Sequence, residues 1–532
     1  MKIRPPGHIA TAILLGLLSI LVLTVTAHDF GVTWDEPVYI EASESYVSWL
    51  AELTVDPAYA LGGAGIREYW TLNHEHPPFD KVWSGLVWSA ARLAFDELTA
   101  HRFGNILLVG LLTALVYLLV TPEYGRGAGL AGVGALFTMP RFFVHAHLTA
   151  LDVPTAATMF LVCFVFWRTF EHPAFKWTIC LGVVFGIAIA TKINGLLEIP
   201  IILVLWSLFL RRHWYVYIRL GLTILFGLAA WVVTWPWLYH DTGQRLVEYF
   251  NFLIVNHYQI GQWYLRHMYA PPPWHFPFVI TLVVVPATLV ILCFVAAFAV
   301  FRSGRKQPLG WLIIFGALVP LIVLASGRAQ VFDDDRLMLP SIPFLAALAG
   351  IGFSLLVHGI RSITWKLDRR AWTVPLTVLL VGITFVPQLA VAWTLYPHLL
   401  SYYSEAVGGL VGATRLGFEN TYWSETYAVA LPFLNANAPQ GALVWVEAHD
   451  VMLYYQHLGL LRRDLRIGSQ FGNEGIVKGT QGYKASIEDA DYAVIQYRES
   501  GFSPAILNWM NSRKPLQELD YINVPLMAIY AR

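Results

Sequence analysis

Charged residues are scarce in this sequence of 532 residues. They make up 13% of the chain, against about 25% in soluble domains. Hydrophobic residues make up 57%, and the mean hydropathy is +0.55. This composition excludes a chain built only of water-soluble or disordered domains. Lysine and arginine (35) equal aspartate and glutamate (35), which excludes nucleic-acid binding through overall positive charge.

Cysteine is almost absent. The three cysteines, Cys163, Cys180 and Cys293, all lie in apolar runs. They therefore supply neither a disulfide framework nor a cysteine zinc site. The glycosylation sequon Asn-x-Ser/Thr does not occur, which favours a bacterial membrane over the secretory pathway. We expect an integral protein of the bacterial plasma (inner) membrane.

Apolar runs long enough to cross a bilayer are abundant. The first run follows Lys2 and Arg4 and lacks a small-residue cleavage site, so we interpret it as an uncleaved first helix. Eleven runs are predicted: 9–27, 103–120, 127–144, 152–170, 177–191, 194–210, 217–238, 276–301, 309–326, 337–358 and 372–395. The fold class is therefore a polytopic α-helical membrane protein with about 11 transmembrane helices.

The loops between these runs differ in positive charge. When the N-terminus is cytoplasmic, the inner loops carry most of the lysines and arginines, which is the positive-inside pattern. An odd number of spans then places the C-terminus outside. Two long loops, 28–102 and 239–275, fall on the outer side. Within the first, Lys81–Phe95 has the apolar spacing of an interfacial helix.

The C-terminal part, 401–532, has the charge content of a water-soluble domain. A helix is predicted over 420–437, ending before Pro439. Three short runs are typical of strands: 442–446, 492–496 and 526–530. We expect a transmembrane domain over 1–400, followed by a small extracytoplasmic α/β domain.

Carboxylates near the membrane are costly and mark candidate sites. Asp35 and Glu36 follow the first run, where two carboxylates could supply a general base. Asp35 could equally be the N-cap of a helix that begins near Pro37. Asp152, two residues before Pro154, opens the fourth run, and it too could cap the helix or belong to a site.

Histidines gather in the two outer loops. In the first loop, Glu75 lies between His74 and His76. Two imidazoles beside a carboxylate could bind a divalent metal or a phosphate, or form only a polar loop before the Pro-Pro turn. The second loop has three histidines among aromatic residues: His257, His267 and His275. They could contact a metal, a sugar or a lipid phosphate, although interfacial aromatic residues are also common without a function.

Two cations lie at the outer ends of spans. Lys192, between the fifth and sixth runs, could bind an anion such as a lipid phosphate, or could extend towards water as lysines at interfaces do. Arg336, at the start of the tenth run, is a candidate phosphate partner. The aspartates before it, Asp333 to Asp335, could bind metal, but such a run is more often a solvated loop.

The order of these motifs resembles a known group of membrane enzymes. The acidic pair is followed by the Pro-Pro loop, the Asp152-Val153-Pro154 start of a span, the Lys192-Ile193-Asn194-Gly195 turn and an Arg-Leu-x-Leu-Pro-x-x-Pro span from Arg336. This set resembles the GT-C superfamily of glycosyltransferases, and within it family 39, which includes protein O-mannosyltransferases and the bacterial aminoarabinose transferase of lipid A. The resemblance covers residues 1–400, approximately.

The resemblance implies transfer of one sugar from a polyprenyl-phosphate donor to an acceptor on the outer face of the membrane, with inversion. The acceptor would be a lipid, a glycan or a protein. Asp35 would be the catalytic base, with Glu36 beside it and Asp152 as the second acidic residue. Glu75 matches a metal-ligand glutamate and His267 a histidine partner, which would hold a divalent metal ion such as Mg²⁺, Mn²⁺ or Zn²⁺.

One position departs from the family. His76 stands where the aminoarabinose transferase has a phosphate-binding lysine, so donor-phosphate binding is assigned to His76, Lys192 and Arg336 together. A lipid-linked sugar phosphate needs an apolar groove, a cation for the departing phosphate and a carboxylate on the opposite side of the sugar. Apolar spans with acidic and basic groups at one membrane face supply all three.

Two other functions stay open. A transporter or flippase for a lipid-linked intermediate is the main alternative, although such a protein would carry charges near mid-span. A non-catalytic scaffold with the same fold is the second. In each case the partners are membrane lipids and a lipid-linked intermediate, and no nucleic acid is expected.

Overall fold

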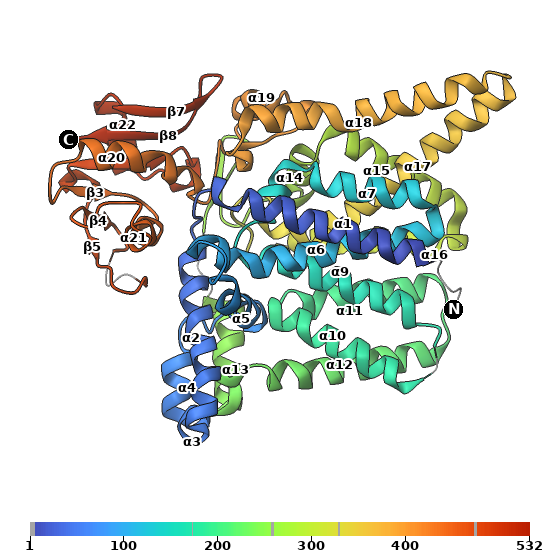
Figure 1. Cartoon of the computed structure of the whole chain (residues 1–532), viewed down its shortest axis with the longest axis horizontal. Helices are drawn as coiled ribbons and strands as arrows, with labels where there is room; N and C mark the ends of the chain where they lie inside the picture. Colours follow the sequence, from blue (N-terminus) through green and yellow to red (C-terminus); the bar gives the residue numbers. More distant parts are fainter. Residues whose placement is uncertain (1–5, 173, 257–259, 328–329, 473–475) are drawn as a thin grey trace.

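The computed structural model describes residues 6–172, 174–256, 260–327, 330–472 and 476–532, so Lys2, Arg4 and His257 lie outside the described residues. Long helices run side by side through most of the molecule, and a β-sheet domain lies at one end of them (Figure 1). The first helix, which starts at Pro6, begins at the opposite end of these helices (Figure 1). The predicted division into an apolar helical part and a sheet-containing C-terminal part is therefore confirmed.

Within the residues that the structure describes, seven helical segments are long and apolar enough to cross a membrane. Each overlaps a predicted run, because a helix satisfies the backbone of an apolar segment within lipid. They are Gly7–Asp29 with α1 (Pro6–Val25), α6 (Glu97–Tyr124), α12 (Trp214–Val233), Ala287–Lys306 with α15 (Ala287–Ser303), α16 (Pro308–Ala325), Arg336–Lys366 with α17 (Ile342–Lys366), and Arg370–Leu395 with α18 (Thr373–Leu395).

Four further predicted runs are helical, but their helices are too short or not apolar enough to be counted as candidate membrane spans. They are α7 (Arg126–Phe137), α9 (Asp152–Thr169), α10 (Phe175–Thr191) and α11 (Gly195–Phe209). Pro140 begins a separate helix, α8 (Pro140–His145), and Pro286 separates α14 (Phe276–Val284) from α15, because proline cannot donate a backbone hydrogen bond within a helix. A total of eleven crossings therefore stays a prediction.

The first predicted outer loop contains four helices: α2 (Glu36–Val55), α3 (Pro57–Leu61), α4 (Gly63–Trp70) and α5 (Phe79–Ala91). The last corresponds to the helix predicted over 81–95, with both ends two to four residues earlier. It packs against α2 and α6. Gly85 makes this approach possible, since a Cβ there would lie 2.6 Å from the Ser43 carbonyl oxygen. These contacts hold α2 beside the N-terminal end of α6.

The second predicted outer loop contains the helix α13 (Thr242–Asn251) and a short antiparallel hairpin of β1 (Gln262–Tyr264) and β2 (His267–Tyr269). The hairpin turn, Leu265 and Arg266, has φ values of 50° and 66°, as a two-residue turn with left-handed residues requires. The Arg266 amide donates to the Gly417 carbonyl (3.0 Å). The hairpin is thereby joined to the C-terminal part of the chain.

The C-terminal part contains a six-stranded sheet in the order β5-β4-β3-β6-β8-β7. The strands are β3 (Leu443–Trp445), β4 (Arg466–Ser469), β5 (Gly482–Lys484), β6 (Tyr492–Gln496), β7 (Gln517–Tyr521) and β8 (Val524–Ala531), with helices α21 (His449–His457) and α22 (Pro504–Ser512). β3, β4, β5 and β6 pair in parallel, whereas β8 is antiparallel to β6 and β7. All three predicted strands are present, as β3, β6 and β8.

The helix predicted over 420–437 begins later than expected. A 3-10 segment, Glu425–Ala430, leads into α20 (Leu431–Asn437). Trp423 and Ser424 have φ values of 68° and 66°, and left-handed residues interrupt a right-handed helix. The bend packs the Trp423 ring against the guanidinium of Arg336, 4.5 Å from the ring centroid.

The sheet domain packs against the first outer loop. The Val32 amide donates to the Tyr455 hydroxyl of α21 (2.7 Å), and the Lys478 amide donates to Glu41 Oε1 of α2 (2.9 Å). Val32 and Ile40 also belong to the apolar core of the sheet domain. The residues that follow α1 therefore lie between the helical part and the sheet domain.

Candidate active site

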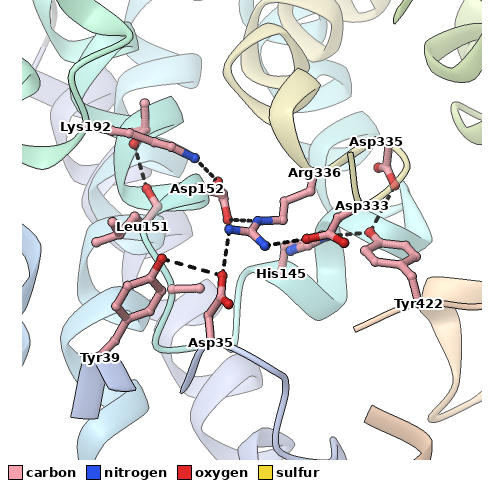
Figure 2. Close-up of polar contacts among 12 residues, drawn as sticks. Asp35, Tyr39, His145, Leu151, Asp152, Lys192, Asp333, Asp335, Arg336 and Tyr422 are labelled. Carbon is pink, nitrogen blue, oxygen red and sulfur yellow. Dashed lines mark hydrogen bonds and ion pairs between the residues drawn. The ribbon is translucent and has the colours of Figure 1, made fainter. Parts of the chain in front are cut away.

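Arg336 forms the centre of a cluster of ion pairs (Figure 2). Its three nitrogens bind three different carboxylates. Nη2 lies 2.6 Å from Asp35 Oδ2, Nε lies 2.9 Å from Asp152 Oδ2, and Nη1 lies 2.7 Å from Asp333 Oδ2. Lys192 Nζ lies 2.6 Å from the other oxygen of Asp152. We call Asp35, Asp152, Lys192, Asp333 and Arg336 the outer cluster.

Four members of the outer cluster lie at helix ends, and Asp333 lies in the turn before Arg336. Asp35 precedes α2 and Asp152 begins α9, yet neither carboxylate makes a capping hydrogen bond. The capping interpretation is therefore wrong for both side chains, which turn towards Arg336 instead (Figure 2). Lys192 follows the last residue of α10. The sequence separates these residues widely, and the packing of α9 with α10 and with the segment that holds Arg336 brings them together.

The three aspartates of the cluster differ in exposure. The side chain of Asp35 is 21% exposed, against 3% for Asp152 and 7% for Asp333. Burial raises the pKa of Asp35, and the Arg336 guanidinium opposes that rise. Tyr39 donates a long hydrogen bond to Asp35 Oδ2 (3.5 Å). Asp35 is thus the carboxylate of this set that a second molecule could reach most easily.

Glu36 lies apart from the outer cluster, although it is adjacent to Asp35 in sequence. Its two oxygens accept from Arg102 Nε and Nη2, both at 2.8 Å, and from the amides of Thr33 (2.9 Å) and Thr149 (3.0 Å). Burial alone would raise the pKa of Glu36, but Arg102 and these amides lower it below its usual range. With both partners fully buried, Glu36 holds the start of α2 against α6.

His76 lies near the outer cluster. Its ring centroid is 6.1 Å from that of Tyr39. Burial, together with the charges of Lys81, Lys192 and Arg336, lowers the pKa of His76 well below its usual range. A neutral imidazole retains one N–H donor and one acceptor nitrogen, so His76 could offer a phosphate a hydrogen bond but no charge.

Glu75 and His267 are not joined by any contact among the described residues. Glu75 Oε1 accepts from Asn73 Nδ2 (2.9 Å), while His267 is exposed on β2. A metal ion held by both stays a prediction. A different group, Glu44, Glu97 and His101, has ligand atoms close enough together to hold a metal ion.

The aspartates before Arg336 do not form a solvated loop. As whole residues, Asp333, Asp334 and Asp335 are 5%, 1% and 3% exposed, so that expectation is wrong. Arg141 Nη1 binds both Asp334 and Asp335 at 2.7 Å. These ion pairs offset the free-energy cost of burying the carboxylates of the loop.

Besides Arg102, three further buried cations among the described residues were missed by the sequence analysis. Arg498, from the sheet domain, donates to Asp333 Oδ1 (2.7 Å) and so connects that domain to the outer cluster. Lys81 donates to the carbonyls of Asn73 (2.6 Å) and His76 (2.8 Å), which fixes the loop that holds Glu75. Of these three, only Arg141 could have been found from the sequence. It lies inside a predicted span, and a charge at membrane depth needs a partner.

Comparison with known proteins agrees with the fold. Residues 75–240 match the family described as dolichyl-phosphate-mannose-protein mannosyltransferase. No curated protein matches the chain. Among solved structures, ArnT from Cupriavidus metallidurans in the apo state is 17% identical with a TM-score of 0.53, and ArnT bound to undecaprenyl phosphate is 16% identical with a TM-score of 0.54; each comparison covers 97% of both chains.

A third structure is less similar. The archaeal oligosaccharyltransferase AglB from Archaeoglobus fulgidus, in complex with an inhibitory peptide and a dolichol-phosphate, is 10% identical with a TM-score of 0.49, covering 94% of this chain and 72% of that one. The family segment begins at Glu75 and includes Asp152 and Lys192. Residues 75–240 are thus similar to the dolichyl-phosphate-mannose-protein mannosyltransferase family, and the chain as a whole shares the fold of the solved ArnT structures.

Proposed function

We propose that the protein transfers a sugar from a polyprenyl-phosphate donor to a hydroxyl of an acceptor on the outer face of the membrane, with inversion and with Asp35 as the general base. The observation that carries this proposal is the bridge that Arg336 makes between Asp35 and Asp152 at 2.6 Å and 2.9 Å. It places a partly exposed carboxylate beside two cations, Arg336 and Lys192, at one end of the helices.

Arg336 and Lys192 are the groups that we assign to the donor phosphate. A phosphate that leaves the sugar gains negative charge, and fixed cations stabilise that charge most where water is largely excluded. The side chains of Arg336 and Lys192 are 7% and 11% exposed, so both are largely shielded from water. ArnT with undecaprenyl phosphate bound has the same fold, which supports a prenyl-phosphate donor here. His76 adds a neutral hydrogen bond.

The reaction then needs one proton transfer and one displacement. Asp35 accepts the proton of the acceptor hydroxyl, and the hydroxyl oxygen attacks the anomeric carbon of the sugar. The bond between that carbon and the phosphate oxygen breaks, and the polyprenyl phosphate leaves with the bonding electrons. Attack from the side opposite the phosphate inverts the anomeric carbon. Asp152 holds Arg336 and Lys192 in place through its two oxygens.

The proposal includes the orientation of the chain. Positively charged loops support a cytoplasmic N-terminus, and the sheet domain lies at the end of the helices away from it (Figure 1). Arg498 of the sheet domain pairs with Asp333 of the outer cluster, so the cluster lies at that same end, and donor and acceptor would meet outside the membrane. The position of the sheet domain beside the outer cluster supports a role for that domain in contacting the acceptor. The acceptor would be a lipid, a glycan or a protein.

The experiment compares wild type with Asp35→Asn at matched expression, by mass spectrometry of membrane lipids and envelope glycans. We expect Asp35→Asn to accumulate one polyprenyl-phosphate sugar and to lose one glycan modification. Glu52→Gln, a carboxylate near the far end of α2, serves as the matched control and should keep the wild-type profile. A wild-type profile for a folded Asp35→Asn protein would reject Asp35 as the base and favour the transporter or scaffold alternatives.

A further inference from the structure

Three potential metal ligands converge where α2 meets the outer end of α6. His101 and Glu97 are one turn apart on α6, and Glu44 faces them from α2. His101 Nε2 lies 3.4 Å from Glu44 Oε1 and 3.2 Å from Glu97 Oε1, and the three ligand atoms all lie within 4.8 Å of one another. His101 has no exposed side-chain surface, whereas Glu44 and Glu97 are 22% and 38% exposed. The group is therefore anchored on its inner side and open to water on the other.

The spacing of these atoms suits a small divalent ion. In tetrahedral zinc sites, ligands bind at about 2.0–2.2 Å, which places neighbouring ligand atoms roughly 3.3 Å apart. The two distances from His101 match that separation. One imidazole and two carboxylates leave the fourth position to water, as in zinc sites with three protein ligands.

The charges around the group leave an excess of two negative charges. Glu41, on the same helix as Glu44, adds a third carboxylate. Among the described ion pairs, the cations that face these carboxylates are Lys478, 3.1 Å from Glu44 and 3.5 Å from Glu41, and His101 if it is protonated. With His101 neutral, as a metal ligand must be, the net charge of minus two matches a divalent cation.

Two buried polar atoms beside the group have no hydrogen-bond partner among the described residues. They are the Tyr454 hydroxyl of α21 and His101 Nδ1. Tyr454 is 1% exposed. Burial, followed by the charges of Glu97, Glu36 and Glu44, raises the pKa of Tyr454 well above its usual range, so the phenol lies near these carboxylates and is neutral. Buried polar groups are normally paired, and a water bound to a metal here would give the hydroxyl a partner.

Aromatic packing also fixes the orientation of the histidine. The ring of Trp88 stacks on His101, with centroids 4.8 Å apart and planes 11° from parallel. Its indole N–H donates to Glu97 Oε1 (3.1 Å). Contacts of this kind, made to the ligands and not to the metal, orient metal ligands. The tryptophan thus restrains both ligands from α6.

We propose that Glu44, Glu97 and His101 bind a divalent transition-metal ion, such as Zn²⁺ or Mn²⁺, at the junction of α2, α6 and the sheet domain. The ion would join the first outer loop to α6, and Tyr454 and Lys478 would extend that connection to the sheet domain. This site is separate from the outer cluster, so its role is structural.

The test uses the full-length protein in detergent, stripped with a chelator and then titrated with Zn²⁺ or Mn²⁺ alone. We compare wild type with His101→Gln and Glu44→Gln, and use His213→Gln, an exposed histidine elsewhere, as the control for adventitious binding. Calorimetry and elemental analysis measure affinity and stoichiometry. We expect wild type and His213→Gln to hold one ion more than His101→Gln, and Glu44→Gln to bind that ion at least about tenfold more weakly.

Thermal unfolding provides a second measurement that does not depend on activity. Zinc should raise the unfolding midpoint of wild type and leave that of His101→Gln unchanged, because only a ligand that binds the folded state stabilises it. Equal stoichiometry and affinity in wild type and His101→Gln would overturn the proposal. So would loss of the ion in Glu75→Gln with retention in His101→Gln, which would place the metal in the Glu75 loop.

Discussion

Replacing Arg336 with glutamine removes the one cation that three carboxylates of the outer cluster share. Arg336 donates from three separate nitrogens to Asp35, Asp152 and Asp333, at 2.6, 2.9 and 2.7 Å. Glutamine is neutral and has a single amide group, so it cannot replace these bonds. Asp152 and Asp333 would retain Lys192 and Arg498 as partners, whereas Asp35 would lose the one ion pair described for it.

Arg336→Gln should lower both the rate of sugar transfer and the folding stability. Removal of one group that stabilises developing charge typically lowers kcat by about 10²- to 10³-fold, so we expect a loss of transfer in that range. Breaking a buried ion pair costs roughly 3–5 kcal/mol of folding stability. Because two of the three aspartates keep another cation, we expect a loss near the lower end of that range.

Transfer is assayed in proteoliposomes with the donor lipid, and unfolding is followed by tryptophan fluorescence in detergent. Arg336→Lys keeps the charge but offers one nitrogen, so its transfer should fall between that of wild type and Arg336→Gln. Arg462→Gln, which breaks a partly exposed pair with Asp464 in the sheet domain, is the matched control for loss of an arginine charge and should leave transfer unchanged. Wild-type transfer by folded Arg336→Gln would refute the assignment of Arg336 to the donor phosphate.

Three further predictions concern the surroundings of the cluster. Because burial raises the pKa of Asp35 and the base acts in its ionised form, transfer should fall as pH decreases through a value above the ordinary aspartate pKa of about 3.9; a pH–rate profile with no acidic limb above that value would contradict this. Glu36→Gln should destabilise the protein by about 3–5 kcal/mol, because it leaves the buried Arg102 unpaired, and thermal unfolding should show a larger effect than transfer per folded molecule; unchanged stability would contradict the structural role. Arg498→Gln should reduce transfer less than Arg336→Gln does, since it acts through Asp333, and equal kcat and KM in this variant and wild type would exclude coupling between the sheet domain and the cluster.

The helices could be predicted from the sequence because lipid demands long apolar segments with internally bonded backbones. The strands β3, β6 and β8 were equally visible, since each is a short buried run. The helix expected over 420–437 was not, because the left-handed residues Trp423 and Ser424 depend on tertiary contacts. One such contact is the hydrogen bond from the Ser424 amide to the Gln496 side chain, which the sequence around Ser424 cannot predict.

The candidate site was predictable in part for a related reason. Charges at the ends of spans, such as Asp152, Lys192 and Arg336, stand out against an apolar background, and the structure brings these three together with Asp35. Arg498 gives no such signal, because arginine is ordinary in a water-soluble domain. The burial of Asp333 was also missed. A run of aspartates predicts a solvent-exposed loop, and only the structure shows the buried arginines that pair with Asp333.

The role of Asp35 as the base is the central claim, and it can be tested with purified components. The polyprenyl-phosphate sugar that accumulates in Asp35→Asn membranes is isolated and added, with wild-type acceptor, to proteoliposomes of wild type, Asp35→Asn or Glu52→Gln. Release of free polyprenyl phosphate is then measured. The account predicts release by wild type and Glu52→Gln and almost none by folded Asp35→Asn, while release by Asp35→Asn at the wild-type rate would contradict it.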